Sequence, residues 1–517
     1  MSDRTAPPSR FQLLLAPVVC SAAPVIMGAL FYSGTNPLSL WQIVRACLLV
    51  MGVTGAVLLL LARSPARLEQ FGAAAAIFAL CSCFFPPAMV AWGIPAFSVA
   101  DRLVGIPLLT VLGLLVGFAV RVDAATVRQT SSVLTVVALV LLLSSGFTLG
   151  RREWQRATEA RLYQVAPEQP LPVLSGKRPD IVHIVFDSLG RPDQLQTTYG
   201  LDTSAFELSW EQAGLVVEPT AFSNYAQTYL SLASMLSLDY LDSERLTALE
   251  FGHREALKTI LENAVAIRAL KQSGYRFELL SSGYSAVDRH PLSDGGISGP
   301  LLFGDFEGYA VLWHPVRLWP YWGWTHAPHE QRTRAILERL KSHRRVPGRP
   351  TYVLAHLLVP HPPFVFGEDG TIRRPNRPFG LRDGSQFPDA DDIYIEGYRA
   401  QAAFVLRQLE AIVANLQRDH PDVVLMVNGD HGPGLGFSFE QPEYSVAEDR
   451  MAIFMAVWPP DSFAPPPSPV NLYRRLFSRL SRQPIPDLPD RAFLSGWARP
   501  FDFIEVDPDA PLQLRPR

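Results

Sequence analysis

The first 150 residues constrain the fold more than any other part of the chain, because they carry very little charge. They contain only twelve Asp, Glu, Lys or Arg residues, whereas a buried helical domain of a soluble protein would need charged outer faces. Crossing about 30 Å of hydrocarbon takes roughly 20 helical residues. Five apolar stretches are long enough, at residues 12–33, 44–62, 71–93, 103–120 and 130–149. The sequence therefore predicts an all-α transmembrane domain of five helices over residues 1–150.

The arginines between these stretches predict the orientation, since cytoplasmic loops carry an excess of Lys and Arg. With the N-terminus inside, only Arg45 and Arg102 of the short loops lie outside. The arginines that lie inside are then Arg4, Arg10, Arg63, Arg67, Arg121 and Arg128. Arg151 and Arg152 favour the opposite orientation, but they precede a large domain, where the rule is weak. Five spans therefore predict an extracytoplasmic C-terminal part, which we expect to begin with an interfacial helix and linker over residues 151–177.

Charge and cysteine usage exclude several classes of function. The net charge of −3 gives no indication of a nucleic-acid partner. All four cysteines, namely Cys20, Cys47, Cys81 and Cys83, lie in the apolar part. The rest of the chain can therefore hold no internal disulfide, no zinc–thiolate site and no cysteine nucleophile.

From about residue 178 the sequence alternates between apolar strands and amphipathic helices. Continuous apolar runs, typical of strands covered on both faces of a parallel sheet, are PDIVHIVFDS, TYVLAHLLV and VVLMV. A helix that ends at Gly274 leads directly into the strand YRFELLSS, which is a step of an α/β fold. The sequence predicts an α/β domain with a mixed, mostly parallel sheet between helices over residues 178–505, followed by a tail at 506–517.

Polar side chains stand at the ends of three of these strands, where ligands bind in such sheets. Asp187 follows the first strand, His356 and His361 lie in and beyond the second, and Asp430 and His431 follow the third. Carboxylates and imidazole together suit Zn²⁺, Mn²⁺ or Mg²⁺. Taken singly, Asp187 could be a helix cap and His361, between prolines, a rigid loop residue. Their joint order favours a metal site.

The segment NYAQTYLSLASMLS, residues 224–237, places one threonine at the start of an apolar helix. Thr228 could simply cap that helix. It could also be a nucleophile, because the field of a helix N-terminus stabilises a developing negative charge. Its place in the chain between Asp187 and the Asp430–His431 pair favours the nucleophile, without excluding the cap.

Taken in chain order, four segments resemble the sulfatase branch of the alkaline phosphatase superfamily: IVFDS, QTYLSLASMLS, LLVPHPPF and VNGDHG. Sulfatases carry the motif Cys-x-Pro-Ser-Arg-Ala-Ser-Leu-Leu-Thr-Gly, and Thr228 falls on its cysteine. The positions of TYLSLASMLSL that match the motif are Ser231, Ala233, Ser234 and Leu236. With five preceding spans, the layout is similar to lipoteichoic acid synthases and the phosphoethanolamine transferases of lipid A.

The resemblance implies roles for individual residues. It implies one divalent metal ion (Zn, Mn or Mg) with four ligands, namely Asp187, Thr228, Asp430 and His431. Thr228 would also be the catalytic nucleophile. His361, in the family's His-x-Pro-aromatic motif, would be a second catalytic residue that contacts the substrate phosphate or the leaving group. His356 is a weaker candidate for substrate binding in the same neighbourhood.

Departures from the family pattern narrow the activity. Formylglycine sulfatases have a second aspartate where this chain has Ser188, and an arginine where it has Leu232. They also need the cysteine that Thr228 replaces, so hydrolysis of sulfate esters is not expected. Two-metal phosphatases of the superfamily use a further histidine near the C-terminus. No histidine follows His431, which favours a single metal ion.

The resemblance implies an enzyme of the bacterial inner (cell) membrane. It would move a phosphoryl-linked headgroup, of the phosphoglycerol or phosphoethanolamine type, from a membrane lipid through Thr228 to an envelope glycan or lipid. One alternative is a phosphodiesterase or phosphatase with the same nucleophile and water as acceptor. A second alternative is a non-catalytic membrane scaffold, which the complete set of metal and nucleophile residues disfavours. Transfer and hydrolysis share their first half-reaction, so the residues leave both open.

Overall fold

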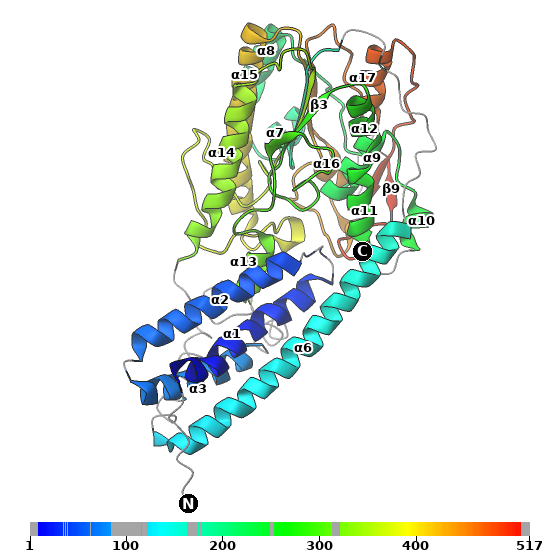
Figure 1. The fold of residues 1–517 in the computed structure, drawn as a ribbon. Coiled ribbons are helices and arrows are strands. Elements are labelled where there is room, and N and C mark those ends of the chain that lie inside the picture. The colour runs from blue at the N-terminus through cyan, green and yellow to red at the C-terminus, as the bar shows by residue number, and fades with distance from the viewer. Residues whose placement is uncertain are drawn as a thin grey trace, which may run out of the picture. The chain divides into compact units, whose positions relative to one another are not determined.

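The chain forms two compact units in the computed structural model (Figure 1). The first consists of residues 1–154, 303–323 and 376–380, and the second of residues 155–302, 324–375 and 381–517. The structure describes residues 9–34, 36, 38, 40–62, 64–83, 115, 121–162, 174, 178–248, 253–312 and 321–507.

The first unit is built from long apolar helices, a form that pairs most backbone groups within the helix itself. They are α1 (Arg10–Tyr32), α2 (Leu40–Leu61), α3 (Pro65–Ser82) and α6 (Ala124–Leu162). Among the described residues, α1, α2 and the Ala124–Glu159 part of α6 are long and apolar enough to cross a membrane. These three correspond to the predicted spans at 12–33, 44–62 and 130–149, and α6 continues unbroken through residues 151–162.

The other two predicted spans are not described in full. The span at 71–93 overlaps α3, which ends at Ser82, and residues 84–93 lie outside the described residues. The span at 103–120 also lies outside them, except for Leu115. The structure therefore supports a membrane-spanning region with three candidate helices, and the count of five remains a prediction.

A short helix from the second half of the sequence completes the first unit. This helix, α13 (Asp305–Leu312), packs against α1 and α2. The Tyr32 hydroxyl donates a hydrogen bond to Asp305 Oδ2 at 2.8 Å, and Arg45 forms an ion pair with Glu307. A boundary drawn near residue 150 by hydropathy therefore misses part of the helical unit, because α13 is held by contacts between distant segments.

The second unit contains a seven-stranded sheet with the order β2-β7-β6-β1-β5-β3-β4. Its strands are β1 (Ile181–Phe186), β2 (Val216–Val217), β3 (Arg276–Leu280), β4 (Gly295–Ile297), β5 (Thr351–Leu357), β6 (Val424–Gly429) and β7 (Met455–Trp458). The two pairs that β7 forms, with β2 and β6, are antiparallel, and the other pairs of this sheet are parallel. The predicted α/β domain with a mixed, mostly parallel sheet is thus confirmed. Two shorter strands, β8 (Ala492–Leu494) and β9 (Ile504–Val506), form a separate pair.

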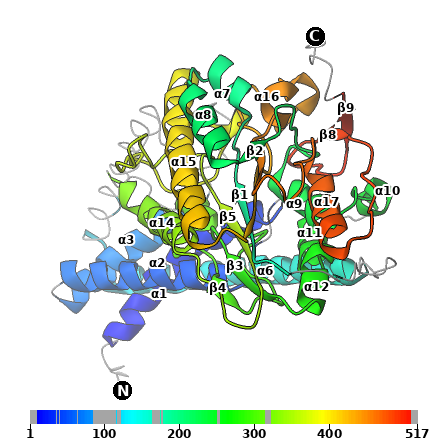
Figure 2. The same cartoon turned by 90° about the horizontal axis from the view of Figure 1, so that it is seen from above.

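Helices cover both faces of the large sheet, as Figure 2 shows. One face packs against α9 (Thr228–Ser237), α11 (His253–Glu262), α12 (Val265–Gln272) and α17 (Leu472–Ser481). The other packs against α8 (Ser204–Ala213), α14 (Ala327–Lys341) and α15 (Asp391–Asp419). Within β1, Ile181 and Val185 enter the first layer, whereas Val182 and Ile184 enter the second. This alternation explains why the strand is apolar on both faces, apart from His183, whose two ring nitrogens are hydrogen-bonded to Tyr473 and Asn428.

Candidate metal and nucleophile site

The central strands end level with one another, and their ends carry the acidic residues of the site. Phe186, the last residue of β1, lies opposite Leu357 of β5 and Gly429 of β6. The next residue after β1 is Asp187, and the next after β6 is Asp430. Parallel pairing therefore brings together two carboxylates that are far apart in the sequence, as the strand-end pattern predicts.

The described residues contain one group with the geometry of a metal site: Asp187, His356 and Asp430. One ligand atom of each lies within 4.8 Å of the others, and all three residues are buried. His356 Nε2 is 3.7 Å from Asp187 Oδ2. Both His356 Nε2 and Asp430 Oδ2 lack a hydrogen-bond partner among the described residues. Buried polar atoms without partners are costly, and a divalent cation would satisfy these two at once.

The protonation of these side chains also fits a cation. Burial lowers the pKa of His356 to about 4, so its imidazole is neutral and can offer a lone pair. Burial and the charge of Asp430 hold the pKa of Asp187 well above its ordinary value. This shift means that two negative charges are unfavourable here unless a positive charge lies between them. The residues present therefore fit a divalent metal ion.

His431 lies beside this group, with one ring nitrogen facing it. Its Nδ1 donates a hydrogen bond to the Gly432 carbonyl at 2.9 Å, which leaves the lone pair on Nε2. His431 Nε2 is 3.7 Å from Asp187 Oδ1 and 3.6 Å from Asp430 Oδ2. Burial, followed by the positive charge of Arg450, holds the pKa of His431 well below its usual value. A neutral imidazole in this position is a suitable metal ligand.

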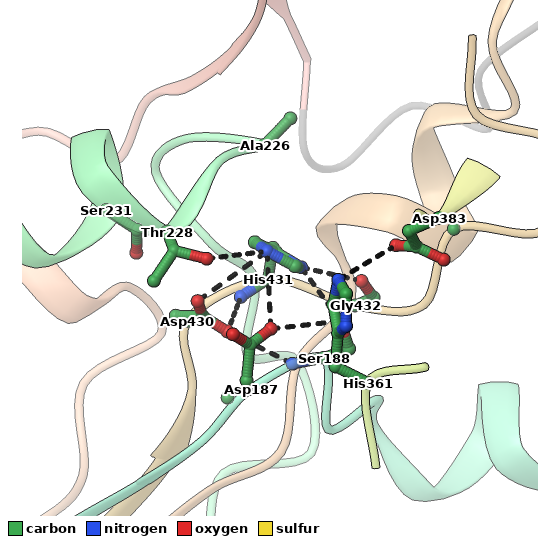
Figure 3. Close-up of polar contacts among 12 residues, drawn as sticks. Asp187, Ser188, Ala226, Thr228, Ser231, His361, Asp383, Asp430, His431 and Gly432 are labelled. Carbon is green, nitrogen blue, oxygen red and sulfur yellow. Dashed lines mark hydrogen bonds and ion pairs between the residues drawn. The ribbon is translucent and has the colours of Figure 1, made fainter. Parts of the chain in front are cut away.

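Thr228 is the first residue of α9 and points toward His431 (Figure 3). Its Oγ1 is 3.2 Å from His431 Nε2. Gln227 occupies the N-cap position, and no side chain caps the helix. The sequence interpretation of Thr228 as a helix cap is therefore wrong, because its hydroxyl faces the strand ends. Apolar residues of α9, such as Leu230 and Leu232, are fully buried and hold this orientation.

The turn after β1 is shaped by Ser188, the residue that departs from the formylglycine sulfatase pattern. Ser188 adopts φ 66°, in the left-handed region. Its N–H donates to Asp430 Oδ1 at 3.1 Å, and its hydroxyl donates to Asp187 Oδ1 at 3.2 Å. The left-handed backbone is unfavourable for a residue with a side chain. It persists here because the turn ties the two carboxylates to each other.

His361 lies in the loop after β5, on the other side of Asp187. Its N–H donates to the Asp187 carbonyl at 3.1 Å, and its own carbonyl accepts from Gln401 at 3.0 Å. The ring nitrogen Nδ1 contacts the Pro362 carbonyl at 2.5 Å, while Nε2 is 3.8 Å from Asp383 Oδ2. The backbone of His361 is thus fixed to the site, and its free ring nitrogen faces a buried acid.

Two functional candidates escape the sequence analysis, Asp383 and Arg450. Arg450 Nη1 donates to Asp383 Oδ2 at 2.8 Å, and Arg450 Nη2 lies 3.3 Å from His431 Nε2. Although burial raises the pKa of Asp383, the charges of His361 and Arg450 bring it below its ordinary value. Asp383 lies in an irregular segment and Arg450 in a five-residue helix, α16 (Ala447–Met451). No periodicity or motif marks either residue.

Comparisons with known proteins place the second unit in a family. The family model described as Sulfatase matches residues 179–474, and no curated protein matches the chain by sequence. Similar solved structures include the C-terminal periplasmic domain of EcEptC from Escherichia coli in complex with Zn. It has 12% identity and a TM-score of 0.42, covering 65% of this chain and 96% of that one.

A longer structural match is the integral membrane protein lipooligosaccharide phosphoethanolamine transferase A (EptA) from Neisseria meningitidis. It has 10% identity and a TM-score of 0.38, covering 90% of this chain and 95% of that one. The phosphonate monoester hydrolase of Agrobacterium radiobacter has 13% identity and a TM-score of 0.37, covering 61% and 80%. At these identities and scores the likeness does not extend to a substrate.

Proposed function

Since this chain belongs to the sulfatase family, we propose that it is a metal-dependent phosphoryl-group transferase with Thr228 as its nucleophile. The group transferred is a phosphoryl-linked headgroup, of the phosphoglycerol or phosphoethanolamine type, from a membrane lipid to a glycan or lipid of the cell envelope. The observation that carries this proposal is the 3.2 Å approach of Thr228 Oγ1 to His431 Nε2. It places a hydroxyl beside the group formed by Asp187, His356 and Asp430.

Asp187, Asp430 and His431 are proposed to hold one divalent ion (Zn, Mn or Mg), as the sequence pattern suggests. Their buried, facing carboxylates and the lone pair of His431 Nε2 support this assignment. We add His356, because its unpartnered Nε2 lies in the same group. When bound, such an ion supplies positive charge that lowers the pKa of a nearby hydroxyl.

Thr228 suits this chemistry for two reasons beyond its position. No cysteine follows Cys83 in the sequence, and threonine stands at the position of the sulfatase cysteine. A formylglycine nucleophile is therefore not available. The N-terminus of α9, where Thr228 lies, offers a positive field to a developing alkoxide and to phosphoryl oxygens. These features favour a phosphoester intermediate on threonine over hydrolysis of a sulfate ester.

The proposed reaction has two displacements at phosphorus. In the first, Thr228 Oγ1 bonds to phosphorus while the bond from phosphorus to the diacylglycerol oxygen breaks, and the hydroxyl proton passes to solvent. His361, held through its backbone at Asp187, gives a proton to the departing oxygen or orients the phosphate. In the second, the oxygen of an acceptor hydroxyl bonds to phosphorus while the bond from phosphorus to Thr228 Oγ1 breaks, and the acceptor's proton passes to Oγ1.

A membrane lipid is a suitable donor because the chain carries candidate membrane spans. We propose a multi-pass protein of the bacterial inner membrane with an extracytoplasmic catalytic domain. The ion pair between Arg45, near the start of α2, and Glu307 of α13 supports this topology. It requires the loop between α1 and α2 to lie on the same side of the membrane as α13. The arginine distribution puts that loop outside the cytoplasm.

The test is to incubate the purified full chain, in detergent with Mn²⁺ or Zn²⁺, with headgroup-labelled phosphatidylglycerol or phosphatidylethanolamine and an envelope extract. We expect diacylglycerol to form in step with a labelled acceptor, and mass spectrometry to find a phosphoryl adduct on Thr228. Diacylglycerol with free labelled headgroup would indicate a hydrolase instead. No turnover of any lipid or of a chromogenic phosphodiester would leave the scaffold alternative.

A further inference from the structure

Arg450 is a fully buried cation whose guanidinium reaches the candidate site. The residue is only 2% exposed. Its Nε donates to the Ala226 carbonyl at 2.9 Å, and its Nη1 donates to Asp383 Oδ2 at 2.8 Å and to the Gly432 carbonyl at 3.2 Å. Burying a guanidinium and a carboxylate costs several kcal/mol in desolvation. The buried ion pair between Arg450 and Asp383 is therefore weak evidence for a purely stabilising role.

The donors of Arg450 are not all satisfied by the protein. A guanidinium has five N–H groups, and the three described above occupy Nε and both N–H groups of Nη1. The remaining nitrogen, Nη2, contacts only His431 Nε2 among the described residues, at 3.3 Å. His431 Nε2 is also the atom proposed to bind the metal ion. Its single lone pair cannot bind the ion and accept a hydrogen bond from Arg450 at the same time. With the site loaded, Nη2 therefore faces it without an acceptor.

An anionic oxygen placed between Arg450 Nη2 and the proposed metal position would be attracted by both. The nucleophile lies in the same place, because Thr228 Oγ1 and Arg450 Nη2 both lie within 3.3 Å of His431 Nε2. Among the described residues, no other Lys or Arg contacts Asp187, Asp430 or His431. The phosphorus atom that Thr228 attacks carries negatively charged oxygens, and these would lie next to Arg450 Nη2.

We propose that Arg450 is a catalytic residue that donates from Nη2 to a non-bridging oxygen of the substrate phosphoryl group. The proposal rests on the proposed function and adds a substrate class. One metal ion and one guanidinium edge match the two non-bridging oxygens of a phosphodiester. A phosphomonoester has a third charged oxygen, and among the described residues no second arginine or lysine contacts the site, so this oxygen would face only His361 and the N-terminus of α9. Arg450 therefore favours phosphodiesters over phosphomonoesters.

The surroundings of Arg450 hold it in one orientation. The Tyr394 hydroxyl donates to Asp383 Oδ1 at 2.7 Å, which fixes the carboxylate that Arg450 grips. The rings of Phe437 and Phe439 lie 4.9 and 5.5 Å from the guanidinium carbon, within the range of cation–π attraction. A donor fixed before the substrate arrives loses little free energy in reorganising at the transition state.

The test uses Arg450→Met and Arg450→Lys in the full-length protein, with Arg254→Met as a matched control. Arg254 is also a buried arginine, stacked on Trp497 at 4.0 Å and bonded to its carbonyl, and we assign it no role in the reaction. Two affinities are measured by calorimetry, one for Mn²⁺ or Zn²⁺ alone and one for bis(p-nitrophenyl) phosphate added to the metal-loaded protein. Turnover of this diester and of p-nitrophenyl phosphate is measured in parallel.

For Arg450→Met we expect metal affinity within a few-fold of wild type, diester affinity weaker by at least about tenfold, and diester kcat lower by about 10²-fold. The ratio of kcat/KM for diester over monoester should fall, and Arg450→Lys should restore part of each loss. Arg254→Met should leave both affinities unchanged. Unchanged diester affinity in Arg450→Met, or an equal loss of metal and diester affinity, would overturn the proposal.

These outcomes distinguish a failure of the Arg450 assignment from a failure of the proposed lipid headgroup transferase. If wild type binds the diester through Arg450 but transfers no lipid headgroup, the assignment of Arg450 stands and the lipid transferase assignment fails. If lipid transfer proceeds equally well in Arg450→Met, the transferase stands and the role of Arg450 is excluded.

Discussion

Thr228 Oγ1 lies 3.2 Å from His431 Nε2, although 203 residues separate the two in the sequence. The threonine comes from the first turn of α9, and the histidine follows β6. Neither residue could reach the other without the sheet, because β6 must pair beside β1 before α9 packs across its face. The contact gives the hydroxyl a position at the edge of the buried acidic group.

Replacement of Thr228 should separate catalysis from folding. Thr228→Ala removes the attacking oxygen, so we expect turnover of a phosphodiester to fall by at least about 10³-fold. The helix should persist, because Gln227 and not Thr228 occupies its N-cap position. Thr228→Ser keeps a hydroxyl and should retain partial activity, with the phosphoryl adduct moving to serine in mass spectra. A fully active Thr228→Ala protein would exclude the nucleophile.

Replacement of His356 tests whether this residue binds the metal ion, as its position in the structure suggests, or the substrate, as the sequence suggests. The family resemblance assigns metal ligation to four residues, namely Asp187, Thr228, Asp430 and His431, and gives His356 only a weak substrate role. In the structure His356 joins the two acids. His356→Ala should weaken Mn²⁺ or Zn²⁺ binding by at least about tenfold in calorimetry. The matched control is His420→Ala, whose ring contacts the carbonyl and the ring of His343 and none of the candidate site residues. Equal metal affinity in His356→Ala and His420→Ala would show that His356 is not a metal ligand and would favour the substrate-binding role.

Asp449 should make stability depend on pH. Its Oδ2 accepts a hydrogen bond from Tyr199 at 2.6 Å, whereas Oδ1 has no partner among the described residues. Burial raises the pKa of Asp449 from 3.8 to about 7. A folded-state pKa above the unfolded value adds stability at low pH, which is lost as the pH rises through about 7.

The variant Asp449→Asn tests this linkage, because it stays neutral and can still accept from Tyr199. We expect its melting temperature to exceed that of wild type by a few degrees at pH 8.5, and the difference to shrink toward pH 5.5. The measurement is a thermal melt of the detergent-purified chain at several pH values. A difference that is constant across this range would show that Asp449 does not titrate near neutrality.

The ion pair between Arg45 and Glu307 should couple two distant parts of the chain. The Glu307 side chain is 7% exposed, and an unpaired charge at such a position is strongly unfavourable. Arg45→Glu and Glu307→Arg should each lower the melting temperature, and the double reversal should recover most of the loss. Additive losses in the double variant would show that the pair contributes no coupling energy.

The sequence alone pointed to most residues of the candidate site, because its strongest signals are local. A strand covered on both faces is apolar at every position, so the residue after it stands out, as Asp187 and Asp430 do. Thr228 stood out in the same way at the start of an apolar helix. Hydropathy likewise predicted the three candidate membrane helices of the described residues, since the length of an apolar run is read directly from the chain.

Other features could not be read locally. Arg450 and Asp383 come from irregular or very short segments and meet only because loops from several strands converge on one edge. His356 looked like one more residue inside a strand, and only the register of β5 against β1 shows which residues it faces. The packing of α13 against α1 and α2 is a similar case, because the sequence of a short helix does not indicate which helices it will contact.

Periodicity and composition therefore determined which segments become strands, helices and spans, and which polar residues end them. Only the tertiary structure decided which of those residues lie together, that the Thr228 hydroxyl faces His431 instead of capping its helix, and that the guanidinium of Arg450 lies beside them. The physical reason is that burial patterns act over a few residues, whereas side-chain contacts depend on how sheet register, helix packing and loops combine over the whole domain.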